Sequence, residues 1–218
     1  SQRFFRWGKA HVRREFGSLP DSWIETLRPP RVVQPAEEHV FITFDEVQRL
    51  AALEIPDDDL ALRRDQAGAV MLFLSGMRAG ALGSLPISVV DIGQRTIKQW
   101  PSLNVHTKNG KSATTYLLPI SELLLVVERW DSFIRARLPP TAMWYTPIDG
   151  RWGVQKLLAV AAGANRNVAI NRRLRKLFAA AGLPFKSAHK FRHGHAVWAL
   201  QRAQTMADYK AVSMNLMH

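Results

Sequence analysis

The densest group of side chains capable of chemistry lies at residues 187–195, which read SAHKFRHGH. His189 and Arg192 are three residues apart, so on a helix they share one face. A guanidinium can clamp two phosphate oxygens while a neighbouring imidazole donates or accepts a proton. This segment is therefore typical of a site that handles phosphate, although a basic helix face without chemistry has the same composition.

The same segment offers a metal site as an alternative, because His189 and His193 have the i, i+4 spacing of paired metal ligands. However, Lys190 stands where a metalloprotease helix carries its glutamate. The sequence also offers no obvious third ligand for a tetrahedral ion. We therefore expect neither a metal ion nor another cofactor.

Arg78 is the second candidate, and it follows a stretch that predicts a helix. One apolar stripe runs along that helix, formed by Ala67, Val70, Met71 and Leu74. Arg78 comes four residues after the end of the stripe, so a continuing helix would point its guanidinium toward the core. That position is unfavourable unless an anion meets the charge. Gly76 is expected to loosen the turn, and an arginine snorkelling at a helix end is the alternative.

Lys108 is the third candidate, beside the pair Asn109-Gly110. That pair predicts a two-residue hairpin turn, in which both positions need positive φ. A lysine at such a tip projects on a movable arm and could reach into a cleft. Lys111, across the turn, is a rival for this role, and a solubilising charge at the tip is the simpler interpretation.

The composition restricts the classes of molecule that these residues could bind. Thirty Lys and Arg against eighteen Asp and Glu give a net charge of +12, which attracts polyanions, nucleic acid above all. A merely solvated basic surface is the alternative. The absence of cysteine excludes disulfides and thiolate zinc sites and fits a reducing cytoplasm. No apolar run approaches the roughly 20 residues of a membrane span, so we expect no membrane partner.

The elements that position these candidates are mostly helical. We expect a first helical unit in residues 1–27 and a basic, proline-rich linker at 28–40. The second unit, 41–218, opens with a capping box between Thr43 and Glu46. The predicted helices span 4–16, 23–27, 44–54, about 57–77, 121–137, 151–162, 167–181, 189–203 and 206–216. The predicted strands span 89–92, 96–100, 103–107 and 112–118. The fold class is therefore mainly α with a small antiparallel β-sheet (α+β).

Four segments resemble, in order, the motifs of the tyrosine recombinase or phage integrase family. They are 75–82 (SGMRAGAL), 105–111 (VHTKNGK), 189–193 (HKFRH) and 214–218 (MNLMH). The resemblance implies the tyrosine-recombinase catalytic-domain fold for residues 41–218. It also implies that residues 1–27 are the end of the family's core DNA-binding helical domain. Since the chain lacks an initiator Met, we expect it to be a fragment.

The resemblance implies a site-specific recombinase of a mobile element that cuts and rejoins double-stranded DNA through a 3′-phosphotyrosyl intermediate. Arg78, Arg192 and His218 would stabilise the phosphate, Lys108 would protonate the leaving 5′-oxygen, and His189 would act as acid or base. The family works as a homotetramer on DNA without metal. A cytoplasmic, nucleoid-associated location follows.

Two features depart from the family pattern. Ala81 stands three residues after Arg78, where the family usually has an acidic residue. The nucleophilic tyrosine should follow His218, and Tyr116, Tyr145 and Tyr209 all precede it. The fragment is therefore expected to be inactive. The rival interpretations are a non-catalytic DNA-binding protein with the integrase fold, a type IB topoisomerase and a basic RNA-binding domain.

Overall fold

A computed structural model describes residues 2–27, 40–150, 153–160 and 166–217. The chain divides into two compact units, Ser1–His39 and Val40–His218. The predicted linker at 28–40 lies outside the described residues except for its last position.

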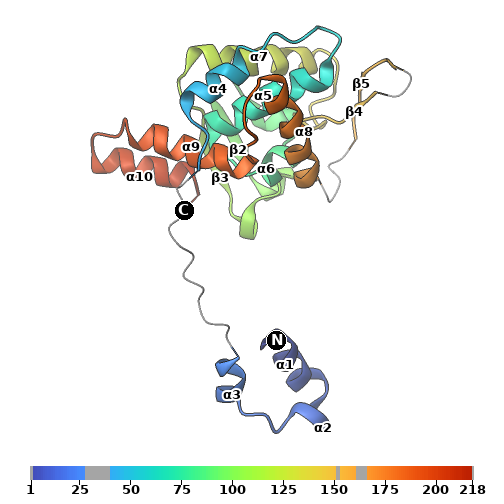
Figure 1. The fold of residues 1–218 in the computed structure, drawn as a ribbon, viewed down its shortest axis with the longest axis vertical. Coiled ribbons are helices and arrows are strands. Elements are labelled where there is room, and N and C mark those ends of the chain that lie inside the picture. Colours follow the sequence, from blue (N-terminus) through green and yellow to red (C-terminus); the bar gives the residue numbers. More distant parts are fainter. Residues whose placement is uncertain (1, 28–39, 151–152, 161–165, 218) are drawn as a thin grey trace. The chain divides into compact units, whose positions relative to one another are not determined.

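Within its described residues, 2–27, the first unit contains three short helices (Figure 1). They are α1 (Gln2–His11), α2 (Arg13–Phe16) and α3 (Asp21–Thr26). The helix predicted over 4–16 is thus interrupted at Val12, whose φ of −128° and ψ of 58° are not helical. Edge-to-face aromatic contacts hold the helices together, including Phe5 against Trp23 at a centroid distance of 5.3 Å.

The second unit begins with the predicted capping box. The Thr43 hydroxyl accepts a hydrogen bond from the Glu46 N–H, the Glu46 carboxylate accepts one from the Thr43 N–H, and α4 (Phe44–Ala51) follows. Asp59 caps the next helix, α5 (Leu60–Ser75), by accepting a hydrogen bond from Leu62 N–H. The predicted capping box is therefore confirmed, and α5 begins three residues after its predicted start at about 57.

Helix α5 is the centre of the unit. The predicted apolar stripe is fully buried, and burial extends to nearly every residue from the second turn onward. In Figure 1, other helices surround α5, and it packs against each of them. They are α4, α6 (Ala79–Ser84), α7 (Ser121–Arg135), α8 (Arg166–Ala180) and α9 (Ala188–Leu200).

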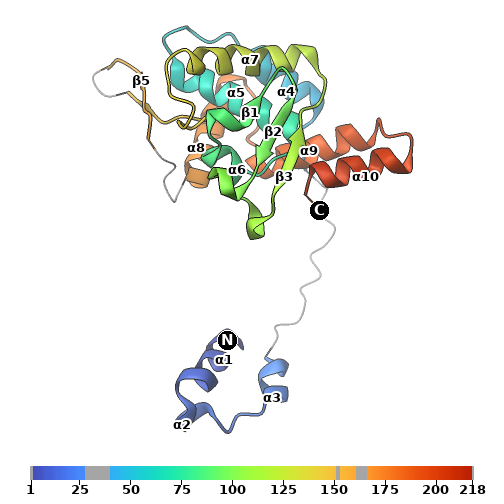
Figure 2. The ribbon, with the colours of Figure 1, turned by 180° about the vertical axis from the view of Figure 1, so that it is seen from behind.

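A three-stranded antiparallel sheet, in the order β1-β2-β3, covers one side of the helices (Figure 2). Its strands are β1 (Val90–Asp91), β2 (Thr96–Gln99) and β3 (Ala113–Tyr116). The strand predicted at 103–107 is wrong. Pro101–Leu103 form a 3-10 turn and Asn104 has a φ of 64°, so the chain leaves the extended conformation there.

The Asn109-Gly110 turn has the predicted backbone, with φ of 61° and 65°. It lies inside the connection between β2 and β3 rather than between two strands that pair directly at the turn. Lys108 therefore sits in a longer loop and not at the tip of a tight hairpin.

The helix predicted at 151–162 is also wrong within its described part, 153–160. There, β5 (Lys156–Leu157) pairs antiparallel with β4 (Ile148–Asp149). Gly153 has a φ of 75°, which a helix cannot contain, and Leu158 N–H donates to Pro147 O across the strand pair.

The last helix, α10 (Met206–Asn215), lies beside α9 in both views of the ribbon. Its final residue contacts the sheet. The Asn215 amide donates to Tyr116 O at 3.1 Å and accepts from Tyr116 N–H at 2.7 Å. The unit is thus mainly α with a small antiparallel sheet, as predicted, and none of its described helices is long and apolar enough to cross a membrane.

Candidate active site

Arg78 projects from a sharp turn between α5 and α6. Helix α5 ends at Ser75, Gly76 adopts the left-handed conformation (φ 63°), and Arg78 then occupies the position before α6 in an extended backbone conformation. The helix does not continue through Arg78, because Gly76 breaks it as expected. A side chain at Gly76 would meet Leu216 at 2.7 Å and His195 at 2.8 Å, so this turn requires glycine both for its φ and for space.

Arg192 is a buried residue of α9 that ties this turn to the end of α10. Its Nη1 donates to Gly76 O at 2.8 Å, and its Nη2 donates to Leu216 O. Burial and then the charge of Arg78 lower the pKa of Arg192 to about 10. Two guanidinium groups thus repel each other across a partly desolvated space, and an anion between them would relieve that repulsion.

His189 lies in the same electrostatic environment, one turn before Arg192. Burial, followed by the charges of Arg192, Lys190 and Arg78, lowers its pKa. The imidazole therefore stays neutral more readily than an ordinary histidine. Its Nε2 lies 2.9 Å from Nε2 of His193.

The structure thus brings together Arg78, His189 and Arg192, three of the five predicted site residues. Lys108 is exposed, and in the described part of the chain it is not among the charges that act on His189 or Arg192. Its rival Lys111 is also exposed and lines a groove between β3 and α10. His218 lies outside the described residues.

His195 is a buried neighbour of this site that sequence reasoning did not single out. Its Nδ1 lies 2.7 Å from Phe73 O, and because a carbonyl only accepts, Nδ1 carries the hydrogen. Burial is the main cause that lowers the pKa of His195 to about 4. A neutral imidazole therefore packs beneath Gly76 and supports the Arg78 turn, and His195 lies two residues beyond the His-x-x-Arg-His run.

A hydrogen-bond network joins the start of α9 to the start of the unit. Lys186 forms a 2.6 Å ion pair with Glu46, and Ile42 N–H donates to Lys190 O. Burial alone would raise the pKa of Glu46, but the hydrogen bonds from Lys186 and Thr43 outweigh it and lower the pKa. A Cβ at Gly194 would fall 2.2 Å from Ile42 O, so α9 and the strand-like entry to α4 are in direct backbone contact.

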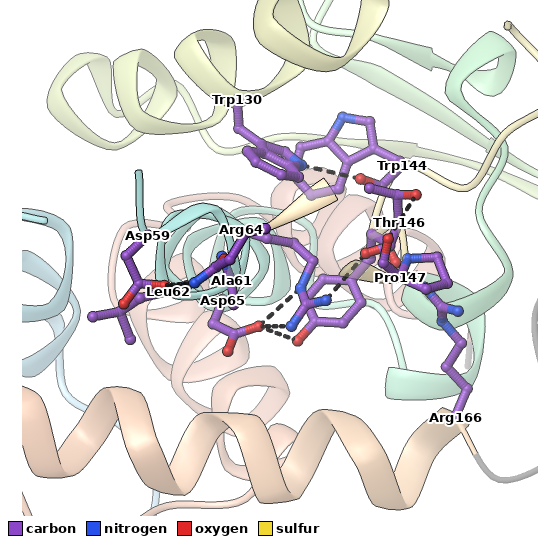
Figure 3. A network of polar contacts seen from close by, with 12 residues as sticks. Asp59, Ala61, Leu62, Arg64, Asp65, Trp130, Trp144, Thr146, Pro147 and Arg166 are labelled. Carbon is purple, nitrogen blue, oxygen red and sulfur yellow. Dashed lines mark hydrogen bonds and ion pairs between the residues drawn. The ribbon is translucent and has the colours of Figure 1, made fainter. Parts of the chain in front are cut away.

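The family's acidic position, Ala81, is buried in α6. A buried carboxylate lies elsewhere, in α5: Asp65 accepts hydrogen bonds from Arg64 at 2.6 Å and from the Tyr145 hydroxyl at 2.5 Å (Figure 3). Burial is the main cause that raises the pKa of Tyr145 far above its usual value. The Tyr145 hydroxyl therefore stays protonated and serves as a hydrogen-bond donor inside the core.

Arg166 extends the same network to α8. Its guanidinium donates to Tyr145 O and approaches the ring of that tyrosine, with Cζ 5.9 Å from the centroid. Figure 3 shows Arg166 reaching from the start of α8 toward Pro147 and Thr146. Arg64 also donates to Thr146 O, so the network fixes the segment before β4 between α5 and α8.

The spacing of His189 and His193 also suggested a metal site. The residues that the structure describes contain no group of three or more His, Asp or Glu side chains that could hold an ion. The cations Arg78, Lys190 and Arg192 act on His189, and they favour an anion as the ligand.

Comparison by sequence finds no match to any family model and none to a curated protein. Comparison by structure finds many matches. One is the XerA recombinase, with a TM-score of 0.60 and 19% identity, covering 100% of this chain and 74% of XerA. Another is a lambda integrase dimer bound to a COC' core site, with a TM-score of 0.56 and 14% identity, covering 95% of this chain and 52% of the integrase.

A third match is the Tn1549 transposon integrase in complex with circular intermediate DNA. It has a TM-score of 0.52 and 15% identity and covers 92% of this chain and 62% of that integrase. The chain thus spans between about half and three quarters of these proteins' lengths. Identities this low establish the architecture rather than the activity. In architecture, the chain has the fold of the tyrosine recombinases and phage integrases, as its four ordered motifs predicted.

Proposed function

We propose that this chain is the catalytic part of a site-specific DNA recombinase or integrase. It would cut and rejoin strands through a 3′-phosphotyrosyl intermediate, with the tyrosine lying beyond His218. The observation that supports this most strongly is the convergence of Arg78, Arg192 and His189 from two different helix starts on one electropositive space. A single DNA phosphate is the ligand that suits such a group.

The proposed chemistry is phosphodiester transesterification. The reaction places additional negative charge on the non-bridging oxygens, and preorganised donors aimed at that charge supply the largest electrostatic effect. Arg78 and Arg192 would be those donors, joined by His218. Lys108 would protonate the leaving 5′-oxygen, and His189 would act as acid or base. The loop that carries Lys108 would need to bring it to the bound DNA, because Lys108 is not among the charges that act on His189 or Arg192 in this structure.

The partner would be double-stranded DNA, held through the basic surface that gives the chain its charge of +12. The first unit would be the end of the core DNA-binding domain, joined by the linker at 28–40. The full-length protein would assemble as a homotetramer on two duplexes. It would work in the cytoplasm, at the nucleoid.

A second candidate is a non-catalytic DNA-binding protein that retains the integrase fold. Two observations favour it. Ala81 gives Arg78 no carboxylate at the position where the family usually has one, and Lys108 does not act on the described part of the site. In this alternative, the arginines would bind a phosphate without cutting beside it.

Trapping the covalent intermediate separates the two candidates. The protein encoded by the gene read past His218 is incubated with a nicked duplex, which releases a short product and so prevents religation. An enzyme accumulates a protein–DNA adduct that survives denaturing electrophoresis, whereas a binding module gives only a reversible complex.

The matched pair of variants for this assay is Arg192→Ala and Arg129→Ala. Both remove one positive charge, but Arg129 is exposed on α7, in a pocket that it shares with α4 and the start of α5. We expect the adduct to fall by about 100-fold or more in Arg192→Ala, the loss typical of a transition-state donor, and to persist in Arg129→Ala. An undiminished adduct in Arg192→Ala would refute the assignment of the clamp.

A further inference from the structure

His189 and His193 form a pair that the proposed chemistry leaves unexplained. They lie one turn apart on α9, with ring centroids 4.4 Å apart and planes at 88°. Their Nε2 atoms are 2.9 Å apart. Two ring nitrogens make a hydrogen bond at this distance only if one carries a hydrogen and the other offers a lone pair. The pair therefore holds one hydrogen between its two Nε2 atoms.

This bond restricts what His189 can present to a ligand. An imidazole has two nitrogens, so with Nε2 engaged by His193, only Nδ1 of His189 remains for a phosphate or a reacting hydroxyl. When His189 donates from Nε2, its Nδ1 is a lone pair and can accept a proton. When Nδ1 takes up that proton, the hydrogen on Nε2 can pass to Nε2 of His193. His189 then stays neutral and His193 becomes the cation.

The surroundings favour this direction of transfer. The charged groups that act on His189 in the described part of the chain are Arg78 from the start of α6 and Lys190 and Arg192 from α9. The other helices packed against α9, namely α4, α5, α8 and α10, add no charge to that set. His189 is also the second residue of α9, where the helix dipole disfavours a cation, and His193 lies a full turn further from that helix start.

We propose that His193 is a positioning residue for His189, one that holds its Nδ1 toward the phosphate between Arg78 and Arg192 and carries the positive charge when His189 accepts a proton. The inference rests on the proposed function for the identity of the anion. The pair itself can be examined without DNA and without a nucleophile, in the 218-residue chain.

The test is a pH titration of the ¹⁵N-histidine-labelled chain, followed by ¹H–¹⁵N spectra that distinguish Nδ1 from Nε2. Wild-type His189 and His193 are expected to show one tautomer each and to respond together to a single protonation, as coupled groups do. His193→Phe keeps a ring but no nitrogen. In that variant, we expect mixed tautomers at His189 and a protonation midpoint lower by about one pH unit, because the charge has no second site.

Two further variants separate positioning from proton sharing. His193→Gln retains a hydrogen-bonding group but cannot take a proton, so the His189 tautomer should be restored while its midpoint stays low. His11→Phe, in the first unit, is the matched control and should leave His189 unchanged. A His189 tautomer and midpoint that are the same in wild type and His193→Phe would overturn the inference.

Inorganic phosphate then tests the ligand. It should raise the shared midpoint in the wild-type chain, because an anion between Arg78 and Arg192 cancels the charges that oppose protonation. If the histidines are coupled but their shared midpoint does not change with phosphate, the phosphate part of the inference and the proposed function would both be overturned. Uncoupled histidines that still respond to phosphate would overturn the inference alone.

Discussion

Arg192 Nη1 lies 2.8 Å from the carbonyl oxygen of Gly76, although 116 residues separate them in the chain. Gly76 is the left-handed residue at which α5 ends, and Arg78 follows two residues later. One of the two proposed clamp residues therefore fixes the backbone turn that aims the other. Arg192 has a structural role as well as the chemical role that its motif predicts.

Arg192→Lys should separate these two roles. A lysine keeps the charge, but its single ammonium cannot reproduce the fork that reaches both Gly76 O and Leu216 O. A buried carbonyl left without a donor costs about 1–3 kcal/mol, so we expect the free energy of unfolding in urea to fall by about that amount. Arg129→Lys, on the exposed face of α7, should change it by less than about 0.5 kcal/mol. Equal stabilities would show that the fork is not needed.

Gly76→Ala tests the packing of the turn independently of its φ. Gly182 has nearly the same φ, 62° against 63°, but a side chain there would meet nothing within 4 Å. Gly182→Ala should therefore cost only the backbone strain, about 1 kcal/mol. Gly76→Ala should cost more, by about 1–3 kcal/mol, because it also overpacks against Leu216 and His195. Thermal unfolding of the two variants measures the difference, and similar losses would contradict the role given to His195.

Stability should fall between neutral and mildly acidic pH because of His195. Its pKa is lowered from 6.5 to about 4, so the unfolded chain binds more protons in that interval and stability rises with pH. Acidification through this window should cost the wild type about 3 kcal/mol at this residue. His195→Phe cannot bind the proton and should show a flatter profile of unfolding free energy. His106→Phe, at an exposed position, should keep the wild-type slope.

The ion pair between Glu46 and Lys186 should make the stability depend on pH in a range lower than that of His195. The pKa of Glu46 is lowered from 4.5, so its contribution is present above that value and is lost as the pH falls through the folded pKa. Glu46→Gln should therefore be less stable than the wild type at neutral pH, and the difference should shrink in acid. Asp57→Asn is the matched control, because Asp57 pairs with Arg63 with its side chain 100% exposed. Parallel pH profiles for wild type and Glu46→Gln would rule out this contribution.

The sequence predicted the helices around the site well because their starts are local signals. Thr43 caps the helix that it was expected to cap, and the bounds of α7, α8, α9 and α10 agree within a few residues. The strand at 103–107 and the helix at 151–162 failed for a different reason. Positive φ at Asn104 and Gly153 prevents the predicted strand and helix from forming there, and an apolar pattern does not reveal a positive φ.

In the candidate site, too, the features that depend on local sequence were predicted, and those that depend on the fold were not. Arg192 and His189 share a face by helical spacing alone, which the sequence contains. The approach of Arg78 depends on a glycine turn and on a buried histidine 119 residues later, and the motif spacing does not show that His195 supports it. The Arg64–Asp65 pair was missed because adjacent charges in a helix usually face water, and only the fold buries them.

The amide of Asn215 makes the same two hydrogen bonds to Tyr116 that a neighbouring strand would make. The carbonyl oxygen of the next residue, Leu216, accepts a hydrogen bond from Arg192 of α9. Two consecutive residues are thus anchored to separate parts of the unit, so the end of α10 cannot move relative to β3 and α9 without breaking these hydrogen bonds. Any movement that carries the following residues must either pull the edge strand with it or release both anchors first.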